Sequence, residues 1–559
     1  MADKWWKEAV VYEIYCKSFC DSDGDGIGDL RGVISKLPML KELGINCIWF
    51  APIYTSPQVD NGYDVADYQD IEPAYGNLEI FKELLDKAHA MGIHVIMDMV
   101  LNHSSDQHRW FQESRKSKDN PYRNYYIWKE PKPDGSEPNN WGNYFKEGNG
   151  SMWEFDELTG EYYLHQYSVK MPDLNWEYEP LRREVYKMLN WWIDFGIDGF
   201  RLDVIPRLKK VPGFPDSKTP LDPVKDKGRF VNAREMCTDV PGIHDFLQEL
   251  NAEVFGKRGC FTVGEGAGIN PGNALMYIAP ERKELDSVYH FELCSRGRYS
   301  LPVDYYRNTQ KNWAEIMAKG GWVVQHLSNH DSARQVSCYG SDGEYRTRSA
   351  KLLGTLTHTM PGIPFVYQGE EIGMTNVYFD SIEDYDCCYT LGDYDTLVKN
   401  GLSPEEALRT VAPRSRDHAR TPYQWTAGEN AGFTTGKPWM KLNPRYTEIN
   451  LEADRASEDS IFAFYQKLTA MRKVHPAIVE GDIQFYLDAH PQLLVYTRSC
   501  EEETLLVVAN YSEEKATVSL PCVLNNGNWE RILTNTEGSS AVFARGELAP
   551  WEAEVYKLK

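Results

Sequence analysis

The feature that most constrains the fold is an alternation of short apolar runs with longer amphipathic segments. Eight runs rich in β-branched and aromatic residues have the composition of strands, and they lie at 9–15, 45–53, 94–101, 198–205, 260–265, 288–293, 322–331 and 363–373. Helical patterns lie between several of them, for example over 78–91 and 184–195. Strands that alternate with helices pair in parallel through right-handed crossovers. Eight such units predict an α/β fold, the (β/α)8 or TIM barrel.

Three segments depart from this alternation and predict additions to the barrel. Residues 104–175 are rich in Asn, Gly, Pro and Trp, and loops that long are usually functional, so we expect an inserted subdomain after the third strand. Residues 374–455 form a second long insertion, polar and aromatic. Near the C-terminus, short alternating runs between turn residues predict an antiparallel β-sandwich domain. The expected organisation is a barrel over 1–103 and 176–480, a subdomain over 104–175 and a C-terminal domain over 481–559.

The charge balance argues against two classes of partner. The chain carries 60 Lys and Arg against 83 Asp and Glu, a net charge of −23. Such a charge repels phosphate backbones and anionic membranes, so we expect neither a nucleic-acid nor a membrane partner. The sequence shows neither a secretion signal nor an apolar run of about 18 residues. The 11 cysteines lack zinc or redox spacing, and we expect a cytoplasmic protein, a monomer or small homo-oligomer.

Polar residues recur where the expected barrel strands end. They are Asp98, His103, Arg201, Asp203, Glu265, His330 and Asp331. The carboxyl ends of barrel strands face one end of the barrel, where the following loops build active sites. One polar residue at a strand end is usually a cap or a hydrogen-bonded loop residue. Carboxylates at the ends of the third, fourth, fifth and seventh strands indicate a shared site.

Two of these carboxylates could cleave a glycosidic bond with retention. That chemistry needs a nucleophilic carboxylate and a protonated carboxyl about 5–5.5 Å apart. Arg201 lies two residues before Asp203, so on a strand both side chains face the same way, and the guanidinium favours an ionised Asp203. Glu265 ends an apolar strand between two glycines, a dry setting that suits a general acid. Glu370 and Glu371 also end a strand, and the residues alone do not choose between the candidates.

Four strings carry a family resemblance. They are DMVLNH (98–103), GFRLD (199–203), TVGEG (262–266) and SNHD (328–331). In order and spacing they resemble the four motif regions of the α-amylase superfamily, glycoside hydrolase family 13. Longer strings resemble its oligo-1,6-glucosidase subfamily of α-glucosidases in particular, including NNWG (139–142), PDLNW (172–176), YQGEEIGMTN (367–376) and RDHARTP (416–422). The resemblance spans nearly the whole chain and implies a retaining glycoside hydrolase on a (β/α)8 barrel.

The resemblance also implies roles for individual residues. Asp203 would be the nucleophile, Glu265 the acid/base, and Asp331 the carboxylate that grips the sugar hydroxyls. The other positions imply substrate contacts: Asp60 and Tyr63 under the −1 sugar, His103, Arg201 and His330 around the same ring, Arg416 near +1, Val204 beside the nucleophile, and Phe145 and Tyr167 on the pocket wall.

The loop DSDGDGIGD (21–29) predicts a metal site. Oxygen ligands stand at alternate positions, on Asp21, Asp23, Asp25, the Ile27 carbonyl and Asp29. Such hard ligands suit calcium, and Gly26 permits the sharp turn. Gly32 stands where an EF-hand carries glutamate, so the loop is not an EF-hand. The resemblance implies a structural Ca²⁺, or Mg²⁺, remote from the chemistry.

Val204 directs the expected specificity. In the subfamily that the strings resemble, valine directly after the nucleophile goes with α-1,6 activity, and alanine or threonine with α-1,4 preference. The insertions at 104–175 and 374–455 would wall the site into a pocket that admits a chain end. We therefore expect exo-acting release of glucose from the non-reducing end of short α-1,6-linked gluco-oligosaccharides, such as isomaltose, panose and isomaltotriose.

Several alternatives stay open. Met171 and Gly266 depart from the subfamily's strings near +1, so an α-1,4-preferring, sucrose-active or trehalose-active α-glucosidase is an alternative. A transglucosylase or sucrose isomerase is another, although SARQVSC (332–338) does not match the basic segment typical of isomerases. A non-catalytic barrel relative, of the kind that accompanies amino-acid transporters, would lack the three acids that this chain carries.

Overall fold

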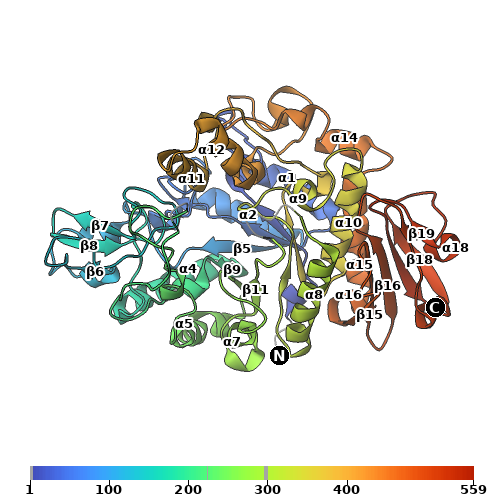
Figure 1. Ribbon diagram of the computed structural model, residues 1–559, viewed down its shortest axis with the longest axis horizontal. Coiled ribbons are helices and arrows are strands. Elements are labelled where there is room, and N and C mark those ends of the chain that lie inside the picture. The colour runs from blue at the N-terminus through green and yellow to red at the C-terminus, as the bar shows by residue number, and fades with distance from the viewer. Residues whose placement is uncertain (1–3, 223–224, 295–299) are drawn as a thin grey trace.

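The centre of the molecule is a parallel sheet of eight strands. The computed structural model describes residues 4–222, 225–294 and 300–559 (Figure 1). The strands are β1 (Val11–Ile14), β2 (Cys47–Phe50), β5 (His94–Met99), β9 (Gly199–Leu202), β10 (Phe261–Glu265), β11 (Ser287–Tyr289), β12 (Val324–Gln325) and β13 (Ile363–Tyr367). Their order is β11-β10-β9-β5-β2-β1-β13-β12. A parallel bridge between Val288 and Val323 joins the two ends, so the sheet closes into the barrel that the eight apolar runs predict.

The strands alternate between the barrel interior and the helices outside. Val11, Trp49 and Val263 pack together in one apolar cluster, whereas Tyr12 and Ile48 belong to the larger cluster shared with the helices. Both faces of a barrel strand are covered, which explains why these runs are apolar without interruption. The observed strands are shorter than the runs, most of all at 322–331, where only Val324–Gln325 is strand.

Helices surround the barrel (Figure 1). The larger ones are α1 (Leu30–Leu43), α2 (Leu78–Ala90), α4 (Glu179–Phe195), α5 (Ile243–Leu250), α8 (Val303–Ala318), α10 (Arg346–Thr359) and α15 (Ile461–Val474). Side-chain caps begin several of them: Asn77 accepts from the Ile80 N–H at the start of α2, and Ser460 from the Ala463 N–H at the start of α15. The helical patterns over 78–91 and 184–195 are confirmed by α2 and α4.

The two insertions are separate segments that contact each other. Residues 104–175 include α3 (Arg109–Ser114) and a small antiparallel sheet of β6 (Trp128–Lys129), β7 (Trp153–Asp156) and β8 (Glu161–Leu164). The 374–455 insertion contains α11 (Cys388–Lys399), α12 (Pro404–Val411), α13 (Asp417–Arg420) and α14 (Leu451–Ala456). The insertions meet where Lys146 Nζ lies 2.8 Å from Asp393 Oδ1.

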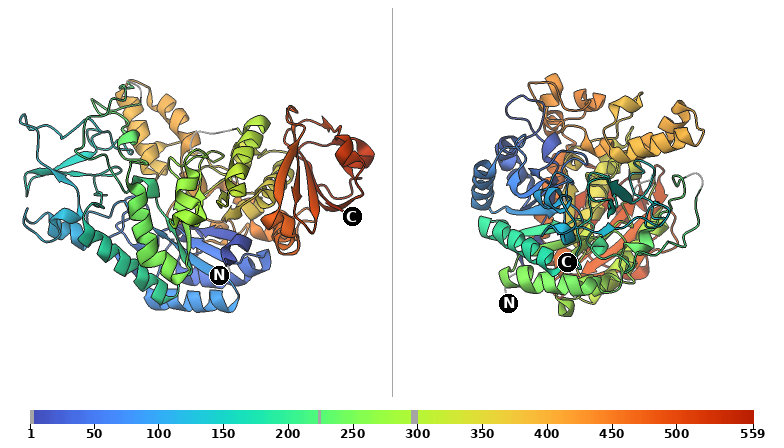
Figure 2. Two further views of the ribbon diagram at one scale, coloured as in Figure 1. Left: turned by 90° about the horizontal axis from the view of Figure 1, so that it is seen from below. Right: turned by 90° about the vertical axis from the view of Figure 1, so that its left-hand side faces the viewer.

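The C-terminal domain is an antiparallel sheet at the opposite end of the long axis from the small sheet (Figure 2). Its strands are β14 (Asp482–Tyr486), β15 (Leu493–Ser499), β16 (Thr504–Asn510), β20 (Ala553–Leu558) and β18 (Trp529–Thr534), in that spatial order. One face packs on α10 and α15. The other face packs against a second sheet of β17 (Ala516–Thr517) and β19 (Glu547–Leu548). The predicted antiparallel domain is confirmed.

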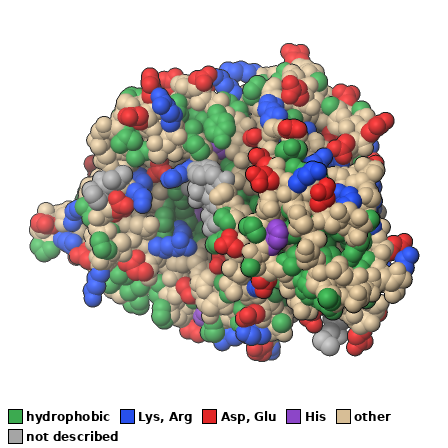
Figure 3. Space-filling model, turned by 45° about the vertical axis from the view of Figure 1, so that its right-hand side comes forward, with side chains coloured by type: hydrophobic (Ala, Val, Ile, Leu, Met, Phe, Trp, Pro, Cys, Tyr) green, Lys and Arg blue, Asp and Glu red, His purple; other side chains and the backbone are tan. Residues whose placement is uncertain are grey.

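The surface carries charges of both signs. Acidic and basic side chains are interspersed over the face in Figure 3, with apolar groups between them. In the described ranges, none of the helices combines the length and the apolar character that a membrane span requires.

Candidate active site

The polar residues at the strand ends meet in one cavity of about 300 Å³. The cavity lies at the carboxyl ends of the barrel strands, where the insertions cover the barrel. Its lining includes Asp60, Tyr63, His103, Phe145, Tyr167, Asp203, Val204, Glu265, Asp331 and Arg416. Arg201 and His330 are fully buried and contact lining residues. The structure thus brings together all the residues for which the sequence predicted catalytic or substrate-binding roles.

Arg201 ties three carboxylates together. It lies on β9, and its Nη1 donates to Asp203 Oδ1 at 2.9 Å and to both Asp98 oxygens at 3.0 Å. Its Nη2 lies 3.0 Å from Glu265 Oε2. Asp203 directly follows β9 and Glu265 ends β10, and because these strands are paired neighbours the two carboxyls face each other across Arg201.

Opposing effects act on the pKa of the Asp203 carboxyl. Burial raises the pKa of Asp203 well above its ordinary value, the charge of Glu265 raises it further, and Arg201 lowers it. The effect of the guanidinium, which the sequence predicts, is therefore outweighed. Arg201 thus favours the ionised Asp203 that a nucleophile requires, against the effects of burial and of Glu265. One protonated and one ionised carboxyl are the forms that retaining glycoside hydrolysis uses.

Val204 holds a strained backbone between the two acids. Its φ of 37° and ψ of 41° are left-handed, a region that β-branched residues rarely adopt. In this conformation the Val204 N–H donates to Glu265 Oε2 at 2.8 Å. Strain of this kind persists only where the surroundings enforce it, and it occurs most often at functional sites.

Asp331 is held by two arginines. Arg420 Nη2 donates to Asp331 Oδ1 at 2.8 Å, and Arg416 Nη1 donates to the same oxygen at 3.2 Å. Arg416 Nη2 also donates to Asp60 Oδ1 at 2.6 Å. Sequence reasoning missed Arg420, although it follows Arg416 by four residues around α13, a spacing that places both side chains on one face of a helix.

A buried network supports the floor of the cavity. Tyr63 Oη lies 2.7 Å from His330 Nε2 and donates to Asp98 Oδ2 at 3.0 Å. The other ring nitrogen of His330 bonds to Glu13 on β1. Burial lowers the pKa of His330 to about 3, so this ring is neutral near pH 7. Glu13 was also missed, and the signal for it was a glutamate inside a strand whose other residues are apolar.

His103 offers an open hydrogen-bonding position at the cavity. Burial lowers its pKa to about 4. Its Nε2 is buried and has no hydrogen-bond partner among the described residues. A sugar hydroxyl in the cavity would provide a partner for this nitrogen.

Aromatic side chains from both insertions form the wall. The rings of Phe145 and Tyr167 lie 5.5 Å apart, and Tyr389 on α11 meets Phe145 edge to face at 4.6 Å. Gly392 makes this approach possible, because a Cβ there would lie 2.1 Å from the Phe145 carbonyl oxygen. Sequence reasoning missed Tyr389, which nothing in its local pattern distinguishes.

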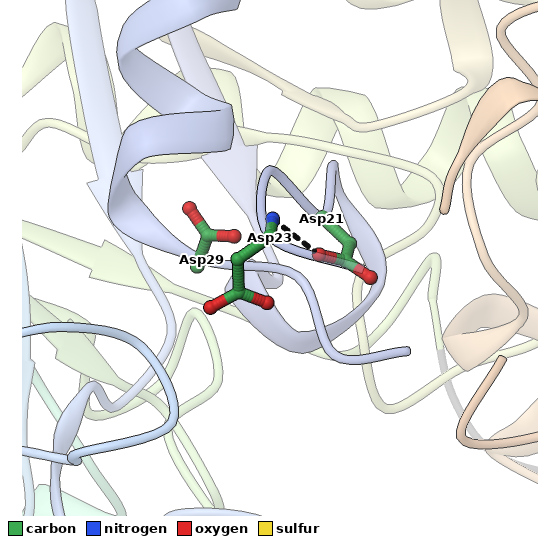
Figure 4. A group of neighbouring side chains, drawn as sticks. All are labelled: Asp21, Asp23 and Asp29. Carbon is green, nitrogen blue, oxygen red and sulfur yellow. Dashed lines mark hydrogen bonds between the residues drawn. The ribbon is translucent and has the colours of Figure 1, made fainter. Parts of the chain in front are cut away.

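The predicted metal loop brings three carboxylates together (Figure 4). Oxygens of Asp21, Asp23 and Asp29 lie within 4.8 Å of one another. Asp25 lies outside this group, and its Oδ1 accepts from the Ile27 N–H at 2.7 Å. In the described part of the chain no Lys or Arg forms an ion pair with the four loop aspartates. This donor set of oxygens alone, uncompensated by a cation of the protein, fits a hard divalent ion.

Comparisons with known proteins agree over the full length. The alpha amylase catalytic domain family matches residues 13–481, and the maltogenic amylase C-terminal domain family matches residues 483–552. An oligo-1,6-glucosidase of Parageobacillus thermoglucosidasius is 46% identical, with 99% of each chain covered. A trehalose-6-phosphate hydrolase of Bacillus subtilis is 42% identical over 99% of this chain and 98% of its own.

Solved structures show the same architecture. A trehalulose synthase of Pseudomonas mesoacidophila MX-45 superimposes with a TM-score of 0.93 at 40% identity, and all of both chains is covered. A trehalose-6-phosphate hydrolase of Bacillus licheniformis gives 0.90 at 41% identity, also with full coverage. With its barrel, its C-terminal sheet domain and full-length relatives above 40% identity, the chain belongs to the α-amylase family of glycoside hydrolases, family 13, and is an α-glucosidase within it.

Proposed function

We propose that this α-glucosidase is retaining and exo-acting, and that it releases glucose from the non-reducing end of short α-1,6-linked gluco-oligosaccharides. The observation that carries the proposal is the arrangement of Asp203 and Glu265 around Arg201, in a cavity walled by both insertions. The 46% identical relative named an oligo-1,6-glucosidase supports the linkage.

In the proposed mechanism Asp203 attacks the anomeric carbon while Glu265 gives its proton to the glycosidic oxygen. The C–O bond to the aglycone breaks, and a glucosyl ester forms on Asp203. Glu265, now ionised, takes a proton from water, whose oxygen attacks the same carbon and releases Asp203. Asp331, held by its two arginines, accepts hydrogen bonds from sugar hydroxyls, and these bonds strengthen in the transition state.

The linkage preference rests on Val204. It lines the cavity beside Glu265, and its side chain offers no hydroxyl to an aglycone. Apolar shape differences are worth about 1–3 kcal/mol in discrimination. The expected preference for α-1,6 over α-1,4 linkages is therefore clear but not absolute.

A substrate panel tests the proposal. We expect kcat/KM for isomaltose and panose to exceed that for maltose, sucrose and trehalose. Val204→Thr should shift the isomaltose-to-maltose ratio toward maltose by about tenfold, the low end of the range for one pocket contact. Val204→Ala enlarges the space at this position without adding a hydroxyl, so it separates the effect of space from the effect of the hydroxyl in Val204→Thr. A wild-type enzyme that prefers maltose would refute the α-1,6 assignment.

The loop at 21–29 is proposed to hold Ca²⁺, with Mg²⁺ as an alternative, in a structural role. A ligand that binds only the folded state stabilises it by mass action. Chelation should lower Tm and leave activity at low temperature largely intact, and Asp21→Asn should remove this response. Asp380→Asn, at an exposed aspartate outside the loop, is the matched control. An unchanged Tm together with no bound calcium by elemental analysis would make the loop an acidic turn.

A further inference from the structure

One buried charge on the cavity wall has no counterion among the described residues. Arg207, the last residue of the short helix η4 (Ile205–Arg207), lines the cavity and is only 7% exposed. Its Nη1 donates to the Tyr167 hydroxyl at 2.7 Å, and its guanidinium lies 4.1 Å from the centre of the Tyr144 ring. Its Nε is buried without a hydrogen-bond partner. Among the described residues no carboxylate forms an ion pair with Arg207, although buried charges are normally paired.

Three cations near Arg207 do have carboxylate partners. Two residues on, Lys209 Nζ lies 2.5 Å from Glu177 Oε1. The buried Lys210 Nζ lies 2.8 Å from Asp173 Oδ2. Across the cavity Arg416 pairs with Asp60 and Asp331. The carboxylates near this segment thus form ion pairs with other cations.

A second arginine lines the same cavity. Arg234, in the short helix η5 (Arg234–Met236), is exposed, and within the described ranges it too forms no ion pair. The adjacent Glu235 accepts from Thr219 Oγ1 at 3.1 Å. Burial raises the pKa of Tyr144, and the charges of both Arg207 and Arg234 lower it, which places the two guanidinium groups around one tyrosine.

We propose that Arg207 and Arg234 form an anion-binding subsite on the aglycone side of the cavity, which takes a phosphate monoester carried by the second sugar of an α-glucoside. The inference rests on the proposed function in that the cleaved glucose occupies the carboxylate end. Asp60, Asp203, Glu265 and Asp331 repel an anion there, so a phosphate is accommodated only on the arginine side. Guanidinium groups bind phosphate through paired, charge-assisted hydrogen bonds.

The chemistry restricts which substrates can use the subsite. A glucose joined through its own O6 has no free O6, so isomaltose cannot carry a 6-phosphate on its second sugar. A 6-phosphorylated second sugar requires a linkage that leaves its O6 free, such as α-1,1 or α-1,4. The subsite therefore adds phosphorylated disaccharides of those linkages to the neutral α-1,6 substrates.

Inhibition by a product analogue tests the subsite directly. Hydrolysis of p-nitrophenyl α-glucoside is measured with glucose, glucose 6-phosphate or inorganic phosphate as inhibitor, at low and high salt. We expect glucose 6-phosphate to inhibit competitively with a Ki about tenfold or more below that of glucose, since charge-assisted bonds are the stronger kind. The advantage should fall in Arg207→Gln, in Arg234→Gln and at high salt. Arg229→Gln removes an exposed arginine that pairs with Glu137 away from the cavity, and should keep the advantage.

Two outcomes overturn the inference. One is a wild-type Ki for glucose 6-phosphate no lower than that for glucose. The other is an advantage that persists in both Arg207→Gln and Arg234→Gln. Competitive inhibition by phosphate alone, lost in the same variants, shows that the site reads the phosphate and not the sugar. Failure of the proposed function would show separately, as a preference for maltose in the substrate panel. Calorimetric titration with glucose 6-phosphate and glucose tests the subsite without turnover.

Discussion

An aspartate flanks each end of strand β9, and the pKa values of the two are shifted in opposite directions. Asp198 precedes the strand and accepts hydrogen bonds from His89 Nε2 at 2.8 Å, His94 Nδ1 at 2.9 Å and the Val95 N–H at 2.8 Å. Burial raises the pKa of Asp198, but these bonds outweigh it and bring the pKa down to about 2. Asp203 follows the strand, where burial and Glu265 raise its pKa despite Arg201.

The two opposite pKa shifts indicate that Asp198 serves stability and that Asp203 serves chemistry. A lowered carboxyl pKa means that the folded state favours the ionised form, so Asp198 stabilises the fold at neutral pH. A raised pKa means that ionisation costs folding free energy, and Asp203 therefore carries a cost in stability. Residues at the carboxyl end of a barrel serve chemistry and those at the other end serve stability, and one strand of four residues shows both.

The largest expected effect is a loss of kcat in variants at the carboxyl ends of the barrel strands. Asp203→Asn and Glu265→Gln should each lower kcat by roughly 10³-fold or more, because each removes one of the two roles in the reaction. Asp203→Asn should leave Tm unchanged or raise it, since it removes a charge whose ionisation is disfavoured. Steady-state kinetics and thermal unfolding check both parts. Near-normal turnover in a folded variant would break the assignment.

A smaller effect is expected at the opposite end. Asp198→Asn should destabilise the protein by roughly 2 kcal/mol, which follows from a pKa that falls from 3.8 to about 2, and kcat should not change. This stability is present above the unfolded pKa and is lost as the pH falls through about 2. Denaturant unfolding at pH 7 measures the change. Asp194→Asn, at an exposed aspartate paired with Arg258, is the control. An equal loss of unfolding free energy in Asp194→Asn would show that Asp198 contributes no more to stability than an exposed aspartate.

The smallest effect concerns His89. Its hydrogen bond to Asp198 raises its pKa, and burial opposes this. The stabilisation is complete below the unfolded pKa of about 6.5 and is lost as the pH rises through the raised folded value. Tm should therefore decline as the pH rises above about 6.5, and His89→Gln should flatten that decline. An identical slope in the variant would show that His89 does not contribute.

The barrel could be predicted because its signal is repeated. Eight apolar runs give eight strands, and an error in one boundary does not change the fold. The expected boundaries are wrong where polar residues enter the run: 322–331 is expected as one strand, but only Val324–Gln325 is strand, and Val323 adds a single bridge to Val288. After the strand, Asn329 and Asp331 line the cavity and His330 contacts Tyr63, and the backbone leaves the ladder to place them.

The site could be predicted only in part, because many of its contacts join distant segments. Motif residues such as Asp203 and Glu265 stand at strand ends, and the topology alone brings them together. Tyr389, Glu13 and Arg207 could not be found this way, because their roles depend on which residues they meet. In the 21–29 loop, alternate spacing predicts Asp25 as a ligand, whereas the carboxylates that lie within 4.8 Å of one another are those of Asp21, Asp23 and Asp29.

The contact between Phe145 and Gly392 has a consequence for synthesis of the chain. The pocket wall needs Phe145 and Tyr389, and Asp331 needs Arg416 and Arg420, so a ribosome-bound chain that ends before about residue 420 has the acids but no enclosed site. At typical elongation rates of about 5–20 residues per second, the barrel's first strands wait tens of seconds for these partners. Substrate can therefore assist folding of this protein only after most of it has been translated.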